Sequence, residues 1–166
     1  MASNSHPEPP AGSIRRLEFP TLLPAPIADV WRITTDFDFV VYLMKPWFTI
    51  TYDKSGGGHL LAGGWTRDTD WKLFGIIPYG RWHEQIIEWN PPHRFVDLIG
   101  GSPFKFWRHS HIYEERGTST LYTDSMEIDP GWMGATAIWC TRLLWIPRRR
   151  KLRQYFEKRH LASQSK

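Results

Sequence analysis

Residues 81–115 read RWHEQIIEWNPPHRFVDLIGGSPFKFWRHSHIYEE, and this stretch indicates the fold of the whole chain. Residues 81–89 and 94–99 are rich in aromatic and aliphatic side chains, which is typical of strands. Asn90-Pro91-Pro92 between them is a strong breaker, so the chain turns there. Consecutive strands that are joined by short turns pair antiparallel, and the stretch therefore predicts part of an antiparallel sheet.

Residues 106–115, at the end of the same stretch, show the regular alternation of a half-buried strand. Successive side chains of a strand point to opposite faces, so every second residue shares a face. One of the two faces carries Trp107, His109, His111 and Tyr113. The pattern predicts that two imidazoles and two aromatic rings lie together on one side of the sheet.

The remaining elements complete an α+β fold around these strands. A strand at 13–22 precedes two short helices, one starting near Pro26 and one after the capping residue Asp36. Further strands are expected at 47–52, 65–74 and 119–129, with a turn at 78–80, and a long helix follows Pro130-Gly131. That helix is apolar nearly all round at 133–146, which predicts burial on more than one side, and Pro147 predicts a kink. One long helix can cover a curved antiparallel sheet of about seven strands, and the two layers leave a cavity where the sheet curves away.

Length and composition fit a single domain. The chain has 166 residues, and we expect the domain at 14–160, between a disordered leader at 1–13 and a C-terminal tail at 161–166. Cys140 is the only cysteine, which excludes an intrachain disulfide and a cysteine-rich zinc site. The polar, Pro-rich leader lacks the apolar segment of a signal peptide, and no apolar run approaches the ~18 residues of a membrane-spanning helix. These features predict a cytoplasmic protein.

Positive charge is concentrated near the C-terminus. Residues 148–159 hold seven basic side chains against the single acid Glu157, so this segment carries +6 and the rest −2 of the net +4. A basic helical segment is most often a solvated face. We therefore expect no nucleic-acid partner, and the alternative is weak contact with an anionic membrane through Arg148, Arg149, Arg150 and Lys151.

Three motifs resemble those of a known family. The stretch 81–115, the run LYTDSMEID at 121–129 and the closing RRRKLRQYFEKR at 148–159 resemble bacterial ligand-binding proteins of the START-related superfamily, called SRPBCC. The resemblance covers about residues 14–160, with Ser102 and Tyr113 as small departures. It implies the helix-grip fold, in which a curved antiparallel sheet wraps on a long C-terminal helix. Members include lipid-transfer domains, pollen-allergen-like proteins and polyketide cyclases, so the fold alone does not name the function.

His109, His111 and Asp124 form the most suggestive polar set. The strand that follows the two imidazoles can place Asp124 beside them. A His-x-His pair with a carboxylate can bind a metal, act as acid and base, or form a structural network that Asp124 and Asp97 orient. We expect no metal ion and no cofactor, and these three residues would be catalytic only if the protein is an enzyme.

Aromatic residues make up 15% of the chain, and this surplus favours a ligand cavity, because such pockets are lined mainly by apolar and aromatic side chains. We expect a small hydrophobic molecule, such as a lipid, an isoprenoid or an aromatic polyketide, in a cavity of at least about 300 Å³. The alternative functions are a cyclase-, aromatase- or hydratase-like enzyme and an interaction domain. We expect the protein to be a monomer or a homodimer. The expected ligand-binding residues are Trp71, Trp82, Phe104, Trp107, His109, His111, Tyr113, Asp124, Trp139 and Trp145.

Overall fold

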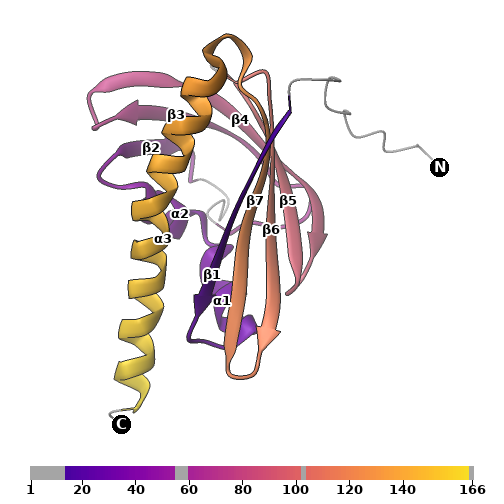
Figure 1. Ribbon diagram of the computed structural model, residues 1–166, viewed down its shortest axis with the longest axis vertical. Coiled ribbons are helices and arrows are strands. Elements are labelled where there is room, and N and C mark those ends of the chain that lie inside the picture. The colour runs from indigo at the N-terminus through magenta and orange to yellow at the C-terminus, as the bar shows by residue number, and fades with distance from the viewer. Residues whose placement is uncertain (1–13, 55–59, 102–103, 165–166) are drawn as a thin grey trace, which may run out of the picture.

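A seven-stranded antiparallel sheet forms one layer of the protein (Figure 1). The computed structural model describes residues 14–54, 60–101 and 104–164, so the leader expected at 1–13 lies outside the described residues. The strands lie in the order β1-β7-β6-β5-β4-β3-β2, in which each strand from β3 onward pairs with the preceding one, as short connections require. Their bounds are β1 Arg15–Leu23, β2 Phe48–Tyr52, β3 Thr66–Leu73, β4 Ile77–Asn90, β5 Arg94–Gly100, β6 Phe106–Arg116 and β7 Ser119–Asp129.

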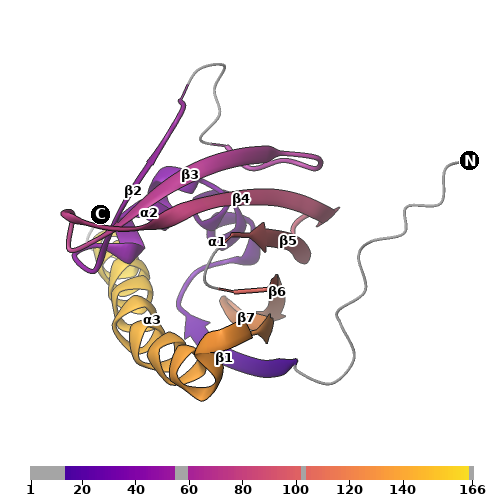
Figure 2. The ribbon, with the colours of Figure 1, turned by 90° about the horizontal axis from the view of Figure 1, so that it is seen from above.

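Helices form the second layer. They are α1 Ile27–Thr34, α2 Phe37–Met44, the short 3-10 helix η2 Gly131–Met133, and α3 Gly134–Gln164. Asp36 caps α2 as predicted, because its Oδ1 accepts a hydrogen bond from Asp38 N at 2.9 Å. Seen from above, the sheet forms an arc and α3 lies across its open side (Figure 2). Together these elements confirm the predicted helix-grip arrangement.

The C-terminal helix is longer than expected. It contains Pro147 and continues to Gln164, into the segment that was expected to be a tail. Within the described part of the chain, none of the helices combines the length and the apolar character needed to cross a bilayer.

Two apolar clusters fill the space between the layers. The larger cluster lies against α1 and α2 and also includes Phe95, Tyr113 and Leu152. The smaller cluster joins Trp82 and Trp107 from the sheet to Trp145 from α3, among others. The two clusters meet around a cavity, and the fold thereby places the site between the sheet and the long helix.

The connection between β3 and β4 differs from the prediction. A turn was expected at 78–80, whereas the chain turns at 74–76 and β4 already begins at Ile77. Phe74 and Gly75 have φ angles of 51° and 78°, a left-handed conformation that glycine adopts at little cost. The pairing register between β3 and β4 shifts between Trp71 and Lys72, as it does at a β-bulge.

The first half of α3 is less buried than its apolar sequence predicted. Its inner face, with Ala137, Thr141 and Trp145, is buried against the rest of the fold. Its outer face and the preceding turn expose four large apolar side chains, namely Trp132, Trp139, Leu143 and Ile146. The prediction of burial on more than one side is wrong, because the sheet covers α3 on one side and no further layer of described residues lies beyond it (Figure 2).

Candidate functional site

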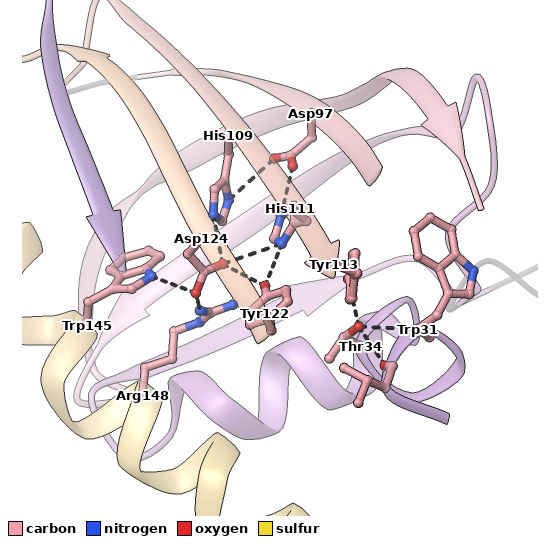
Figure 3. Close-up of polar contacts among 11 residues, drawn as sticks. Trp31, Thr34, Asp97, His109, His111, Tyr113, Tyr122, Asp124, Trp145 and Arg148 are labelled. Carbon is pink, nitrogen blue, oxygen red and sulfur yellow. Dashed lines mark hydrogen bonds and ion pairs between the residues drawn. The ribbon is translucent and has the colours of Figure 1, made fainter. Parts of the chain in front are cut away.

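The predicted face of β6 points into the fold. Trp107, His109, His111 and Tyr113 are all buried, and they alternate with partly exposed neighbours. In the strand register Asp124 of β7 lies opposite His111, and Asp97 of β5 lies opposite His109. Residues that are directly opposed in an antiparallel pair have Cβ atoms only about 4.5–5.5 Å apart. The sheet therefore holds the two imidazoles between two carboxyl groups (Figure 3).

Asp124 is fully buried and lies at the centre of a polar network (Figure 3). Its Oδ1 accepts a hydrogen bond from the Tyr122 hydroxyl at 2.6 Å and lies 3.1 Å from His109 Nε2. Its Oδ2 accepts a hydrogen bond from Trp145 Nε1 at 3.1 Å and forms an ion pair with Arg148. Burial by itself would raise the pKa of Asp124, but Arg148 and the contact with His109 outweigh burial and hold that pKa well below its usual range. Asp124 is therefore ionised, and all its hydrogen bonds are accepted ones.

Arg148 is buried, which corrects the expectation that it belongs to a solvated basic face. Its relative exposure is only 5%. It follows Trp145 by one helical turn and precedes Leu152 by another, so the helical period places it on the inner face of α3. Burial opposes its charge, but Asp124 raises the pKa of Arg148, so the guanidinium stays protonated. The spacing of three and four residues from the apolar Trp145 and Leu152 was the sequence signal that would have placed Arg148 on the buried face.

Two of the other basic residues that were expected at a membrane are also engaged within the protein. Arg149 Nε donates a hydrogen bond to Thr21 Oγ1 at 3.0 Å. Lys151 Nζ donates to the backbone oxygen of Tyr42 and also lies over the Tyr42 ring, 3.9 Å from its centroid. Arg150 is exposed. Asp124 neutralises the charge of Arg148, whereas the hydrogen bonds of Arg149 and Lys151 to neutral groups hold these side chains against the protein without removing their charge.

Asp97 lies on the other side of the imidazoles from Asp124. Its Oδ1 is 3.1 Å from His111 Nε2, and its Oδ2 is 3.9 Å from His109 Nδ1. Burial raises the pKa of Asp97 to about 6, although His109 opposes this shift. Burial also lowers the pKa of His109 and lowers that of His111 to about 3. Both imidazoles are therefore neutral at pH 7, a state in which one ring nitrogen of each offers a lone pair.

Glu84 is a second buried acid, which the sequence-based prediction did not include. It lies between Trp82 and Ile86 on the same face of β4, and all three side chains are buried. The Thr69 hydroxyl donates a hydrogen bond to Glu84 Oε1 at 2.9 Å. Burial, with a further contribution from Asp97, raises the pKa of Glu84 to about 8, so its carboxyl group is mainly protonated at pH 7. Its position between two apolar residues of the same face was the signal that would have found it.

A cavity of about 70 Å³ lies in front of these polar groups, between the sheet and α3. A neighbouring cavity of about 40 Å³ lies closer to the start of α3. Both volumes are below the ~300 Å³ that is usual for ligand sites, so the expected ligand-sized cavity is not present in this conformation. The partition between the two cavities consists of the five side chains that line both, namely Met44, Trp71, Trp82, Trp107 and Trp145.

Two indole groups of this partition carry unsatisfied donors. Trp82 Nε1 and Trp107 Nε1 are buried, and neither has a hydrogen-bond partner among the described residues. A buried donor without a partner costs about 1–3 kcal/mol, because it has lost its hydrogen bond to water. Both rings line both cavities, so these N–H groups are available to a molecule bound there.

The structure brings most of the expected ligand-binding residues together. Tyr113 and Asp124 are buried but do not line either cavity, and the Tyr113 hydroxyl instead lies 2.8 Å from Thr34 Oγ1. Trp139 is 62% exposed, so its predicted place at the cavity is wrong. It lies two residues after the buried Ala137, and two residues turn an α-helix through more than half of a circle. The main cavity is lined by Trp71, Trp82, Trp107, His109, His111 and Trp145, and the second by Phe104.

Comparison with solved structures confirms the fold. Protein CV1439 from Chromobacterium violaceum matches with a TM-score of 0.68 and 15% identity, over 87% of this chain and 97% of that one. Ara h 8.0201 matches with a TM-score of 0.65 and 12% identity, over 87% and 99% of the two chains. Protein Ms6760 from Mycobacterium smegmatis matches with a TM-score of 0.65 and 14% identity, over 84% and 89%. Likeness at such low identity concerns the fold alone, and it shows that this chain has the helix-grip fold of these structures.

Comparison of sequences gives a narrower assignment. No curated protein matches the chain. A family model matches residues 21–156, a range that includes every residue of the polar network described above. The chain therefore belongs to the family described as Domain of unknown function (DUF8410), whose model covers the strands β4 to β7 and α3 as far as Phe156.

Proposed function

We propose that the protein binds a small hydrophobic molecule, as a carrier or a sensor, between the sheet and α3. The observation that carries this proposal is the composition of the cavity wall. Aromatic rings surround two buried indole N–H groups that lack partners among the described residues, and polar side chains converge at one end. Ligand sites combine a mainly apolar wall with a few convergent polar groups that fix orientation. The likeness to helix-grip structures is consistent with such a site but does not identify its ligand.

The polar groups favour a ligand with an apolar body and a neutral oxygen-containing group. Trp82 and Trp107 offer N–H donors, and the protonated carboxyl of Glu84 can both donate and accept. Arg148 also lines the cavity, but Asp124 already neutralises its charge. A carbonyl or hydroxyl group is therefore a better fit than an anion, which would lack a free counter-charge in a buried site.

The size of the cavities indicates that a larger ligand enters only when the partition moves. An apolar cavity of about 150 Å³ holds benzene, and neither cavity reaches that volume by itself. Met44 is the most adaptable side chain of the partition, because it is unbranched and has three rotatable bonds. It lies on α2 and touches both cavities. Displacement of Met44 would join the two spaces into one site that contacts the free indole donors.

The test combines an unbiased search for the ligand with a designed block. Native mass spectrometry of the purified protein, followed by organic extraction, should reveal a stoichiometric apolar adduct. Titration with 2-naphthol, a neutral aromatic alcohol, should quench the tryptophan fluorescence and saturate. Ile99→Phe adds volume to a residue that lines the main cavity and should abolish both signals. Ile112→Phe is the matched control, because its side chain lies on the opposite face of the sheet from the buried His111 and Tyr113. Unaltered binding by Ile99→Phe, or no binding by the unmodified protein, would overturn the proposal.

An enzyme of the cyclase or hydratase type is the second candidate, and the pairing of Asp97 with the imidazoles favours it. Neutral His109 beside a carboxyl group can accept and return a proton at the cavity wall. The partner in proton transfer would be Asp97, because the oxygens of Asp124 already accept bonds from other residues. If the extracted molecule is turned over, His109→Gln should abolish turnover while leaving binding intact. Full turnover by this variant would refute the hypothesis of an enzyme in which His109 transfers the proton.

A further inference from the structure

Three potential metal ligands converge at the cavity wall. They are one ring nitrogen each of His109 and His111 and a carboxylate oxygen of Asp97, and these atoms all lie within 4.8 Å of one another. Asp97 comes from β5, and the two imidazoles come from the adjacent strand β6. All three side chains line the main cavity. Figure 3 shows them close together. The set differs from the one expected from the sequence, in which Asp124 accompanied the two histidines.

The contact with Asp124 determines which nitrogen of His109 carries the hydrogen. Asp124 is ionised by its ion pair with Arg148, so its oxygens can only accept hydrogen bonds. His109 Nε2 lies 3.1 Å from Asp124 Oδ1 and must therefore be the donor. In a neutral imidazole the other nitrogen is then the acceptor. The lone pair of His109 Nδ1 consequently faces Asp97.

Tyr122 determines the tautomer of His111 in the same way. Its hydroxyl donates its only hydrogen to Asp124 Oδ1 at 2.6 Å. The contact of 2.6 Å between the same hydroxyl and His111 Nδ1 therefore requires a hydrogen on Nδ1. The lone pair of His111 Nε2 then points at Asp97 Oδ1, which is 3.1 Å away.

Two imidazole lone pairs thus face one carboxyl group. A single proton on Asp97 can bridge to His111 Nε2, but it leaves His109 Nδ1 without a hydrogen-bond donor among the described residues. One cation between the three groups would satisfy all of them together. We propose that Asp97, His109 and His111 bind a divalent transition-metal ion, with Zn²⁺ as the ion that best fits two imidazoles and a carboxylate. This site goes beyond the proposed binding of a hydrophobic molecule and does not depend on it.

The surroundings of the three residues have the features of a metal site. Ligating imidazoles usually donate their other N–H to a carboxylate or another fixed acceptor, and Asp124 and Tyr122 accept these bonds here. Two histidines and one carboxylate with an open position are a common donor set for zinc and non-haem iron. The adjoining cavity of about 70 Å³ leaves room for a water molecule at the open position.

The three ligand atoms must move closer together to bind one ion. A zinc ion binds imidazole nitrogen at about 2.0–2.1 Å in tetrahedral geometry, so two of its ligand atoms lie about 3.3–3.4 Å apart. The three ligand atoms lie within 4.8 Å of one another, so the widest pair must approach by at most about 1.5 Å. Rotation of the Asp97 side chain can shorten its distances to both imidazoles, because Asp97 has no other side-chain partner than these two rings among the described residues.

The first experiment uses the unmodified full-length chain after treatment with a chelator. Titration with Co²⁺ should produce visible absorption bands that saturate at one equivalent, and Zn²⁺ should abolish them by competition. Mg²⁺ should not compete, because it prefers oxygen ligands. Long-range ¹H–¹⁵N spectra of the imidazoles should show His109 protonated at Nε2 and His111 at Nδ1, with Zn²⁺ shifting the two opposite nitrogens. Absence of saturable Co²⁺ absorption, or shifts confined to the other histidines, would overturn the metal site.

Variants then distinguish the residues that bind the metal from those that only hydrogen-bond to its ligands. Asp97→Asn should abolish binding at one equivalent, and Tyr122→Phe should weaken it by about 10–100-fold, as is typical for loss of a hydrogen bond to a ligating histidine. The control is His83→Gln, which removes an exposed imidazole that lies 2.8 Å from Asp68. This control should bind Co²⁺ like the unmodified protein. Equal affinity in Asp97→Asn, or loss of binding in His83→Gln, would show that the metal binds elsewhere. The nitrogen shifts in the unmodified chain remain decisive if a buried variant does not fold.

Discussion

Glu84 offers a sharp test of the electrostatics of the cavity wall. Its carboxyl group is buried, accepts a hydrogen bond from Thr69 and is mainly protonated at neutral pH. Glu84→Gln keeps the shape of the side chain and an oxygen that can accept the Thr69 hydrogen bond, but it cannot ionise. We expect this variant to match the unmodified protein in stability near pH 5 and to exceed it increasingly as the pH rises.

The sign and size of the effect follow from linkage between protonation and folding. The pKa of Glu84 is about 8 in the folded protein, against 4.5 when the group is unperturbed. Between these values the unfolded chain has lost the proton that the folded chain retains, so a rise in pH favours unfolding. Each pH unit in this window lowers the free energy of unfolding by about 1.4 kcal/mol, and the whole window amounts to about 5 kcal/mol as an upper bound. The Glu84→Gln substitution removes this contribution, so the difference between the two proteins grows up to pH 8 and is constant above it.

Urea unfolding, followed by tryptophan fluorescence in the presence of a chelator, measures this difference at a series of pH values. Glu88→Gln is the matched control, because Glu88 lies on the same strand, is 41% exposed and pairs with Arg94 at 3.1 Å. The control should follow the unmodified protein within about 0.5 kcal/mol at every pH. If Glu84→Gln also ran parallel to the unmodified protein between pH 5 and pH 8, Glu84 would be ionised in the folded state and the reasoning would fail.

Three further sets of variants test the packing of the site by urea unfolding. Asp124→Asn leaves the buried Arg148 without its counter-ion and should lower the free energy of unfolding by about 3–5 kcal/mol, and a second change, Arg148→Met, should recover part of this loss. If the destabilising effects of the two substitutions simply added in the double variant, Asp124 and Arg148 would not interact as a buried ion pair. Tyr113→Phe removes the hydroxyl contact with α1 and should cost about 1 kcal/mol, whereas a cost of several kcal/mol would point to a larger role for that hydroxyl. Trp139→Ser should change stability by no more than about 0.5 kcal/mol, but Trp145→Ala should cost about 3–5 kcal/mol, and equal effects would refute the assigned orientation of α3.

Local sequence patterns predicted the elements of this fold well. The alternation along residues 106–115 identified the inward face of β6, and Asp36 marked the start of α2. Order along the chain was enough to predict an antiparallel sheet and a covering helix, because short connections leave consecutive strands few other arrangements. The pairing of Asp124 with the two histidines also followed from the sequence, since β6 and β7 are joined by a short turn.

The tertiary structure decided everything that depends on contacts between distant elements. The period of α3 shows which residues share a face, but only the packed sheet shows that Arg148 lies inside and Trp139 outside. The position of Arg148 then fixes the state of Asp124, the tautomers of both histidines and the convergence of their lone pairs on Asp97. The size of the cavity and the protonation of Glu84 likewise depend on how completely other elements exclude water. A one-dimensional pattern encodes which side chains point the same way, whereas desolvation and charge pairing arise only when those faces meet.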